Sequence, residues 1–313
     1  TVDARYDLEL DLKKQLAALG FYETQTIKLI AENQLRDALP LRPLHEGDII
    51  RVSLPLSEDH SVMRPSLAPS LLSTASRNVR QGAKAVRFFE TGRCFRNAGG
   101  GKAPDLEMDA LGILLGGSSQ PDFWDSLQDT ASDAFTLKGV IETILPDAQV
   151  QLVSAQPGNF LQAAQVLANG KTIGSFAQLS PSRGRELDLE FPVYLAELDL
   201  TRVCDLRGGG SRVVELPQFP GSSRDASMEV PVDLANAEIE KSIRKLNEPL
   251  LVSFGCFDVF RDSSGQKLTA DRKSVAYSFN YRAADRTLKS DEVDAAHQKV
   301  LQHLENALPI SYR

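Results

Sequence analysis

Four charged residues that suit phosphate chemistry fall within one short predicted strand. The stretch VRFFETGRCFR, residues 86–96, carries Arg87, Arg93, Arg96 and Glu90. Guanidinium groups can hold the oxygens of a triphosphate, and a carboxylate can orient a ligand by hydrogen bonding. The stretch therefore raises the hypothesis of the phosphate-holding hairpin of an ATP-using enzyme. The competing interpretation, which we favour, is that Glu90, Arg93 and Arg96 form surface ion pairs, each worth about 0–1 kcal/mol.

Two further groups match catalytic or phosphate-binding motifs only in part. The loop Gly99-Gly100-Gly101-Lys102 lacks the GxxxxGK[ST] spacing and joins two predicted strands instead of opening a helix. We therefore do not expect phosphate there. The adjacent carboxylates Glu58 and Asp59 point apart, so they cannot converge on one substrate for acid–base work. We expect them to cap a helix or to form a salt bridge with Arg64.

The composition indicates a globular protein of about two domains. The chain has 313 residues, 42% of them hydrophobic, and a typical domain holds roughly 100–200 residues. No apolar run approaches the ~20 residues of a membrane span, so we expect a cytoplasmic protein with no membrane partner. The cysteines and histidines lack zinc-ligand spacing, so we expect no metal site. The chain opens at Thr1, and we expect it to be a portion of something longer.

The run Gly208-Gly209-Gly210-Ser211 is the best predicted domain boundary, because successive glycines are costly to hold in a helix or strand. It divides the chain into residues 1–211 and 212–313. The first part has 21 basic and 27 acidic residues, and the second has 14 and 15. The total net charge of −7 disfavours non-specific binding of nucleic acid but permits a local RNA site.

Hydrophobic spacing predicts alternating helices and strands before the boundary. Leu8, Leu12, Leu16 and Leu19 recur at helical spacing and stop at Gly20. The predicted helices cover residues 7–19, 69–81 and 134–145, and the predicted strands cover residues 21–27, 86–96, 108–115, 162–168, 171–179 and 193–198.

After the boundary, the predicted elements follow the order β-α-β-β-α-β. They are a strand over 226–232, a helix over 235–246, two strands flanking the turn Ser263–Gly265, a helix over 291–307 and a strand over 310–313. This order is the split βαβ, ferredoxin-like arrangement.

One strand of this second part presents a choice between RNA contact and core. Val275, Tyr277, Phe279 and Tyr281 lie on one face, and RNA readers often stack bases on sheet aromatics. Two helices must cover one sheet face, however, and a large apolar set belongs under them. We therefore assign the aromatic face to the core.

The opposite face of that strand is small and polar, and it is the candidate RNA site. Its residues Ser274, Ser278 and Asn280 can hydrogen-bond base edges. Phe257 and Arg261 alternate with their neighbours on another strand, so we expect them to share this open face and to supply stacking and a phosphate contact. Further phosphate candidates are Arg224 and Arg286.

Several stretches together resemble one family in order and spacing. They are LPLSEDHSVMRPSLAPSLL (54–72), FFETGRCF (88–95), FPGSSRD (219–225), FDVFRD (257–262) and KSVAYSFNYRAADRTLKSDEV (273–293). The chain is similar, over nearly its whole length, to the C-terminal half of the bacterial phenylalanine–tRNA ligase beta subunit. The resemblance implies an α+β fold, with a class II synthetase-like antiparallel sheet module followed by a ferredoxin-like anticodon-binding domain.

The resemblance also implies a role without catalysis for this chain. Class II synthetases hold ATP with a hairpin arginine and an arginine in a later glycine-rich segment, and here that segment reads VYLAELDL, residues 193–200, with Glu197 and Asp199. A further family stretch, His-Pro-Gly-Arg-Ser-Ala, is degraded to Gln156–Phe160. We therefore expect no catalytic residue and no bound cofactor in this chain. ATP and Mg²⁺ would act through the alpha subunit of an alpha2-beta2 heterotetramer, which charges the tRNA for phenylalanine.

Three functions remain open from the sequence. The first is the non-catalytic subunit that scaffolds the alpha partner and binds the anticodon stem-loop. The second is a free-standing adenylating ligase, which the missing arginine segment disfavours. The third is a protein-interaction module whose ferredoxin-like domain does not bind RNA.

Overall fold

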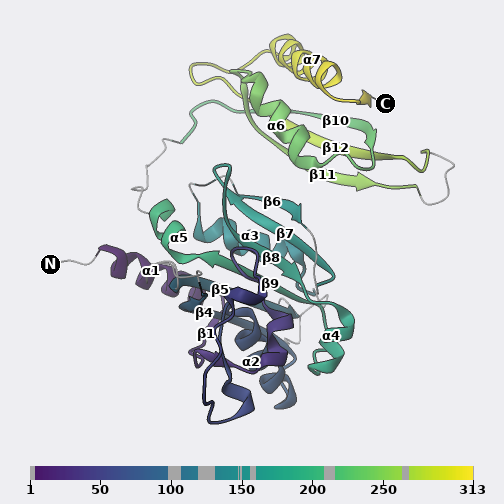
Figure 1. Cartoon of the computed structure of the whole chain (residues 1–313). Helices are drawn as coiled ribbons and strands as arrows, with labels where there is room; N and C mark the ends of the chain where they lie inside the picture. The colour runs from purple at the N-terminus through teal and green to yellow at the C-terminus, as the bar shows by residue number, and fades with distance from the viewer. Residues whose placement is uncertain are drawn as a thin grey trace. The chain divides into compact units, whose positions relative to one another are not determined.

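The computed structural model describes residues 4–97, 107–118, 131–146, 148, 150–155, 160–207, 216–262 and 268–312 (Figure 1). The chain divides into two compact units, Thr1–Ser211 and Arg212–Arg313. Four sequence features lie outside the described residues, namely the loop Gly99–Lys102, most of the stretch Gln156–Phe160, the run Gly208–Ser211 and the turn Ser263–Gly265.

The first unit is built on a seven-stranded sheet. Its strands stand in the order β1 (Tyr22–Glu23), β4 (Ala85–Phe95), β5 (Glu107–Gly117), β9 (Val193–Asp199), β8 (Lys171–Gln178), β7 (Gln162–Ala168) and β6 (Val150–Ala155). The β1–β4 pair is parallel and the other pairs are antiparallel. Both faces of β5 and β9 are buried, so these strands are nearly continuously apolar.

Helices cover both faces of this sheet. On one face, apolar residues of α1 (Ala4–Ala18), α3 (Ala134–Ile144) and α5 (Leu200–Arg207) form a core with alternate strand residues such as Leu111 and Leu198. On the other face, α2 (Ala68–Arg80) buries Leu71, Leu72 and Ala75 against the remaining strand residues, including Leu114 and Leu195 (Figure 1). The polar groups of β4 and β9 considered below lie on this second, α2-covered face.

Short elements complete the first unit. A two-stranded ribbon pairs β2 (Leu29–Ile30) with β3 (Val62–Met63), and α4 (Pro181–Glu186) follows β8. The 3-10 helices are η1 (Glu32–Asp37), η2 (Glu46–Asp48) and η3 (Glu58–His60).

The second unit has the predicted ferredoxin-like order of elements. Its chain runs β10 (Ser222–Pro231), α6 (Asn236–Leu246), β11 (Leu251–Phe260), β12 (Arg272–Tyr281), α7 (Ser290–Ala307) and β13 (Ser311–Tyr312). The antiparallel sheet has the order β11-β12-β10-β13, so β12 lies between the two strands that α6 connects. Apolar residues of α6 and α7 form one core with one sheet face.

The element predictions were wrong at several short elements, including β2 and β3, which were not predicted. The strand predicted over 21–27 is only Tyr22–Glu23, because Thr26 N donates to the Glu90 carboxylate at 3.4 Å instead of continuing the ladder. Strand β6 and helices α4 and α5 were missed, since they are short and β6 has no regular alternation of buried and exposed residues.

Within the described ranges, each helix is too short or too polar to cross a bilayer.

Candidate functional site

A buried ion pair occupies the α2-covered face of the first sheet, beside the hairpin β4–β5. Arg64 Nη1 lies 2.7 Å from Glu90 Oε1, and the two side chains are only 2% and 3% exposed. Arg64 also donates to the Arg93 carbonyl at 2.9 Å and to Thr26 Oγ1 at 2.7 Å. Thr26 in turn donates to Glu90 Oε2 at 2.7 Å. The pair therefore links three separate segments and uses most of its own hydrogen-bonding capacity.

Gly92 leaves the space into which the Arg64 side chain extends. A Cβ at Gly92 would stand 2.4 Å from Arg64 Nη2 and 3.3 Å from Glu90 Oε1. Real Cβ atoms do not approach another heavy atom so closely, so a larger residue at this position would displace the guanidinium group. The ion pair therefore requires a residue without a side chain at position 92.

Glu197 of β9 forms a second polar centre on the same face. Its Oε2 accepts from Ser66 Oγ and from the Leu67 backbone N–H, both at 2.7 Å, at the start of α2. The thiol of Cys94 lies 3.8 Å from its other carboxylate oxygen. Complete burial raises the pKa of Glu197 to about 7, against the hydrogen bonds that lower it. The Glu197 carboxylate thus ties the N-terminal end of α2 to strand β9.

The three hairpin arginines have separate environments. Arg93 is exposed and pairs with Glu107 at 2.6 Å and with Asp109 at 3.5 Å, as the surface-pair prediction expected. Arg96 is buried and donates to the Pro43 carbonyl at 2.9 Å and to the Arg42 carbonyl. Burial lowers the pKa of Arg96. Arg87 lies beside Gly20.

Two surface predictions from the sequence are therefore wrong. Glu90 and Arg96 were expected in surface ion pairs, but both are buried, because segments 24–26 and 42–43 cover them. Helix capping or a salt bridge to Arg64 was expected for Glu58 and Asp59, and the salt bridge is wrong, because the carboxylate partner of Arg64 is Glu90. No spacing along the chain connects residue 64 with residue 90, so sequence reasoning had no signal for this pair.

The described residues of this region do not fit a nucleoside triphosphate. The face beneath α2 presents the carboxylates of Glu90 and Glu197, which repel phosphate, and the Arg64 guanidinium is already paired. Arg93 and Arg96 bind carboxylates or carbonyls of the chain itself. These contacts are consistent with the interpretation, made from the sequence, that the hairpin has a structural role.

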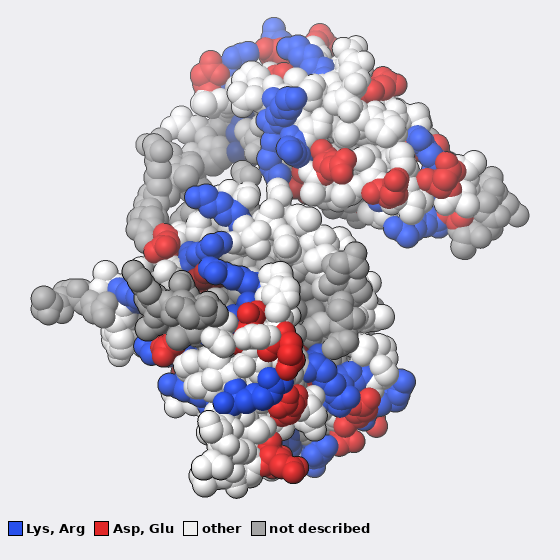
Figure 2. Space-filling view, viewed as in Figure 1, with Lys and Arg blue, Asp and Glu red and all other residues white. Residues whose placement is uncertain are grey.

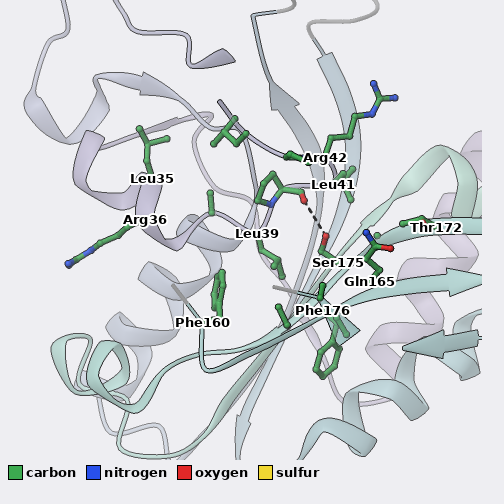
Figure 3. Close-up of a pocket in the computed structure, with 18 residues that line it drawn as sticks. Leu35, Arg36, Leu39, Leu41, Arg42, Phe160, Gln165, Thr172, Ser175 and Phe176 are labelled. Carbon is green, nitrogen blue, oxygen red and sulfur yellow. Dashed lines mark hydrogen bonds between the residues drawn. The ribbon is translucent and has the colours of Figure 1, made fainter. Parts of the chain in front are cut away.

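A cavity of about 500 Å³ lies over strands β7 and β8 of the first unit (Figure 3). Leu39, Leu41 and Phe160 line it, and Ser175 donates to the Pro40 carbonyl at 3.2 Å. Figure 3 shows the Arg42 guanidinium directed away from this cavity. The cavity therefore offers apolar surface without an inward-pointing charge.

The two described helices of the second unit, α6 and α7, leave one face of its sheet uncovered. Val275, Tyr277, Phe279 and Tyr281 of β12 are buried under α6 and α7, so the assignment of the aromatic face to the core is confirmed. The alternate residues of β12 lie on the other face and are partly or fully exposed. We call this face the open face, and its β12 residues are Ser274, Ala276, Ser278 and Asn280.

The open face carries hydrogen-bonding groups on neighbouring strands. Asn280 Nδ2 donates to Ser253 Oγ of β11 at 3.1 Å, and Ser274 Oγ lies 3.0 Å from Ser227 Oγ of β10. Among the described residues, the Ser278 hydroxyl has no partner. These groups could form hydrogen bonds with polar atoms at the edge of a ligand.

The alternation predicted for β11 is wrong at its second half. Cys256 pairs with Tyr277, but Asp258 pairs with Ala276, so a β-bulge falls at Phe257. Beyond the bulge Asp258 and Phe260 stand opposite open-face residues, and Phe260 faces Ser274. Sequence reasoning therefore missed Phe260, because it assumed an unbroken alternation from Phe257.

The predicted phosphate contacts do not gather at one place. Arg224 pairs with Asp294 at 2.7 Å and donates to Ser290 at 3.0 Å, which ties it to α7 on the covered side. Arg286 pairs with Glu292 at 2.7 Å near the start of the same helix. Arg261 is exposed beyond the end of β11 and, within the described part of the chain, has no partner.

The exposed charges of the described residues are of mixed sign on the face that Figure 2 shows. On the face shown in Figure 2, acidic and basic side chains are interspersed over each unit. Strand register places Asp225, Glu229 and Asp258 on the open face. The described residues also contain no cluster of three or more histidine, cysteine or acidic side chains that could hold a metal ion.

Two family profiles match this chain. The profile described as "Phenylalanyl tRNA synthetase beta chain CLM domain" matches residues 2–200, and the "Ferredoxin-fold anticodon binding domain" profile matches residues 217–313. Each profile matches one of the two units.

Several curated relatives are named phenylalanine–tRNA ligase beta subunit. The protein from Symbiobacterium thermophilum is 32% identical over 95% of this chain and 33% of its own length. The one from Synechococcus sp. (strain JA-2-3B'a(2-13)) is 31% identical over 100% of this chain and 38% of its own length. The chain thus spans about a third of the length of these relatives.

Among solved structures, a pyrrolysyl-tRNA synthetase from Desulfitobacterium hafniense is similar to this chain. Its TM-score is 0.50 at 20% sequence identity, over 65% of this chain and 69% of that one. At this identity the match supports a class II synthetase-like fold and nothing finer.

Proposed function

Because this chain belongs to the phenylalanyl-tRNA synthetase beta chain family, we propose that it serves as the scaffolding and anticodon-binding part of a phenylalanine–tRNA ligase. We assign residues 1–211 to a non-catalytic, synthetase-like module and residues 212–313 to the anticodon-binding domain. The assembled enzyme would join phenylalanine to its tRNA in the cytoplasm.

The first module would support a catalytic alpha subunit in an alpha2-beta2 heterotetramer. The closed polar face beneath α2 supports a structural role, since Glu90 and Glu197 stand where phosphate would need cations. ATP and Mg²⁺ would then be bound by the alpha subunit. The segment Asp7–Ile27 is the proposed contact with it, because Tyr22 at the sheet edge and Ile27 are 73% and 58% exposed.

The open face of the second unit is the single observation that carries the RNA-binding proposal. Its small polar residues Ser274, Ser278 and Asn280 lie on a sheet surface that no described helix of this unit covers. Unpaired bases can lie flat on such a surface and bond through their edges. Asp225, Glu229 and Asp258 would repel a phosphate chain there, so bases rather than phosphates would cross the centre of this face.

Stacking would come from the end of β11. Phe260 stands on the open face opposite Ser274, and Phe257 at the bulge is 61% exposed. Base–aromatic stacking is worth about 1–3 kcal/mol per base. Arg261, one residue beyond Phe260, is the proposed phosphate contact. Arg224 and Arg286 remain candidates at the side of α7, where each is already paired.

A titration of the chain with labelled stem-loops tests this function. We expect weak, salt-sensitive binding of the anticodon stem-loop of the tRNA for phenylalanine, and weaker binding of a stem-loop with an exchanged anticodon. If neither RNA binds at low salt, the domain is a protein-interaction module. If both bind equally, the open face does not read the anticodon.

An ATP titration tests the non-catalytic role. We expect no binding at micromolar strength and no ATP–pyrophosphate exchange with phenylalanine by the chain alone. Stoichiometric ATP binding in that range would instead favour a free-standing adenylating ligase.

A further inference from the structure

One loop of the first unit has two leucines that are exposed to solvent. Leu54 is 89% exposed and Leu56 is 104% exposed, and Pro55 stands between them. A single exposed leucine is ordinary on a protein surface. Here two such residues lie two positions apart in one loop, on either side of Pro55, and they form an exposed apolar surface.

Hydrogen bonds close the base of this loop, which we call the leucine loop, residues 52–61. Val52 N donates to the Ser61 carbonyl at 2.9 Å, and His60 N donates to the Ser57 carbonyl at 3.1 Å. Just before it, Arg51 pairs with Glu32 and Glu46, each at 2.5 Å. These bonds restrict the ends of the loop, which reduces the conformational entropy lost when the residues between them are covered.

The leucine loop borders other surface that suits a protein partner. Its base continues into β3, which pairs with β2, and Ile27 lies two residues before β2. Asp59 and His60 of the loop and residues 24–27 line a common cleft of about 900 Å³. Ile27 and the C-terminal end of the leucine loop therefore line the same cleft, next to the β2–β3 ribbon.

From these contacts we propose that the leucine loop is a docking element for the other subunit of the enzyme, with Leu54 and Leu56 buried in an apolar surface of that protein. This proposal rests on the proposed function, which supplies such a subunit. The loop is continuous, through the β2–β3 ribbon, with the segment Asp7–Ile27 already proposed as a contact.

The chemistry of the loop disfavours nucleic acid and membrane as its occupant. Leucine side chains give no aromatic stacking, and Glu58 and Asp59 follow shortly after Leu56. These carboxylates would repel both the phosphates of RNA and an anionic lipid surface. A protein surface with an apolar pocket is the class of partner that this loop fits.

The test is co-expression of the chain with the alpha subunit of the same organism, followed by measurement of their dissociation constant. We expect Leu54→Ser and Leu56→Ser each to weaken the complex about tenfold, and the double variant about a hundredfold, because a buried leucine contributes on this scale. Leu216→Ser is the matched control, because Leu216 is also 89% exposed but lies in the second unit. It should leave the complex unchanged.

Three results would overturn the proposal. Unchanged binding by the double variant would exclude the leucine loop and leave the proposed function intact. No complex between alpha subunit and the wild-type chain would refute both. Self-association of the chain that the double variant abolishes would identify a second copy as the occupant. Unfolding curves should match wild type, because the two side chains contact solvent in the free chain.

Discussion

The two sheets of this protein differ in how their polar side chains are used: those of the first sheet are buried, and those of the second are accessible. Beneath α2, Glu90 and Glu197 are buried, and each accepts hydrogen bonds from neighbouring segments. On the open face of the second unit, Ser278 and Asn280 remain accessible, and so does Phe260 opposite Ser274. The difference lies in what covers the face. Polar groups that already satisfy one another stabilise a fold, whereas accessible ones are available for a ligand.

The largest expected effect is the loss of the buried ion pair. Arg64→Ala would leave the Glu90 carboxylate buried without its cation, and removing one partner of such a pair costs about 3–5 kcal/mol. Urea unfolding of the chain measures this free energy. Arg93→Ala is the control, because its pairs are exposed and should contribute about 0–1 kcal/mol. Equal effects of the two variants would show that burial does not distinguish these pairs.

Glu197 should give a pH-dependent stability. Its folded-state pKa of about 7 lies above the ordinary value of 4.5, so its contribution is complete below pH 4.5 and declines as the pH rises to about 7. Relative to Glu197→Gln, wild type should lose about 3 kcal/mol over this range. Unfolding curves of both proteins at several pH values measure the difference. A constant difference would mean that the pKa of Glu197 is the same in the folded and unfolded states.

The open face should give a smaller effect, on binding instead of folding. Phe260→Ala should weaken the anticodon stem-loop complex by about 1–3 kcal/mol, because one stacked base is lost. Phe135→Ala is the matched control, since Phe135 is 78% exposed in the first unit. Fluorescence titration with wild type and both variants makes the comparison. Equal affinities for all three would remove Phe260 from the RNA site.

The smallest expected effect concerns the arginines. Arg261→Ala should reduce the salt dependence of RNA binding by about one unit of log–log slope, because one phosphate contact is lost. Arg224→Ala should change this slope less, since Arg224 is already engaged by Asp294 and Ser290. Titrations at two salt concentrations separate the two. A larger change for Arg224 would place the RNA phosphates beside α7.

Local sequence patterns were sufficient to predict most of the fold. The helix over 69–81 and the strand over 162–168 agree with α2 and β7, because their apolar spacing directly reflects which side is buried. The open polar face of β12 was predicted for the same reason, since the alternation there is unbroken. The short α5 was missed because it follows β9 without an intervening turn.

The polar centres could not be predicted from spacing. Arg64 and Glu90 lie 26 residues apart in the sequence, and Ser66 and Glu197 lie 131 apart. Only the packing of α2 on the sheet brings them together. The bulge at Phe257 was likewise missed, although Gly255 lies two residues before it and a glycine within a strand can indicate a bulge. The one extra residue moved Phe260 to the open face.

The empty position at Gly92 has a consequence for how the protein can change over generations. Residues 64, 90 and 92 share one small volume, so the effect of a substitution at any of them depends on the other two. Alanine at 92 should be harmful beside arginine at 64 and better tolerated once a shorter residue stands there. A paired mutational scan of the two positions would reveal this epistasis, and it would vanish if the guanidinium could simply move aside. If the epistasis is found, substitutions at residues 64, 90 and 92 are tolerated only in certain combinations, which restricts the order in which they can occur during evolution.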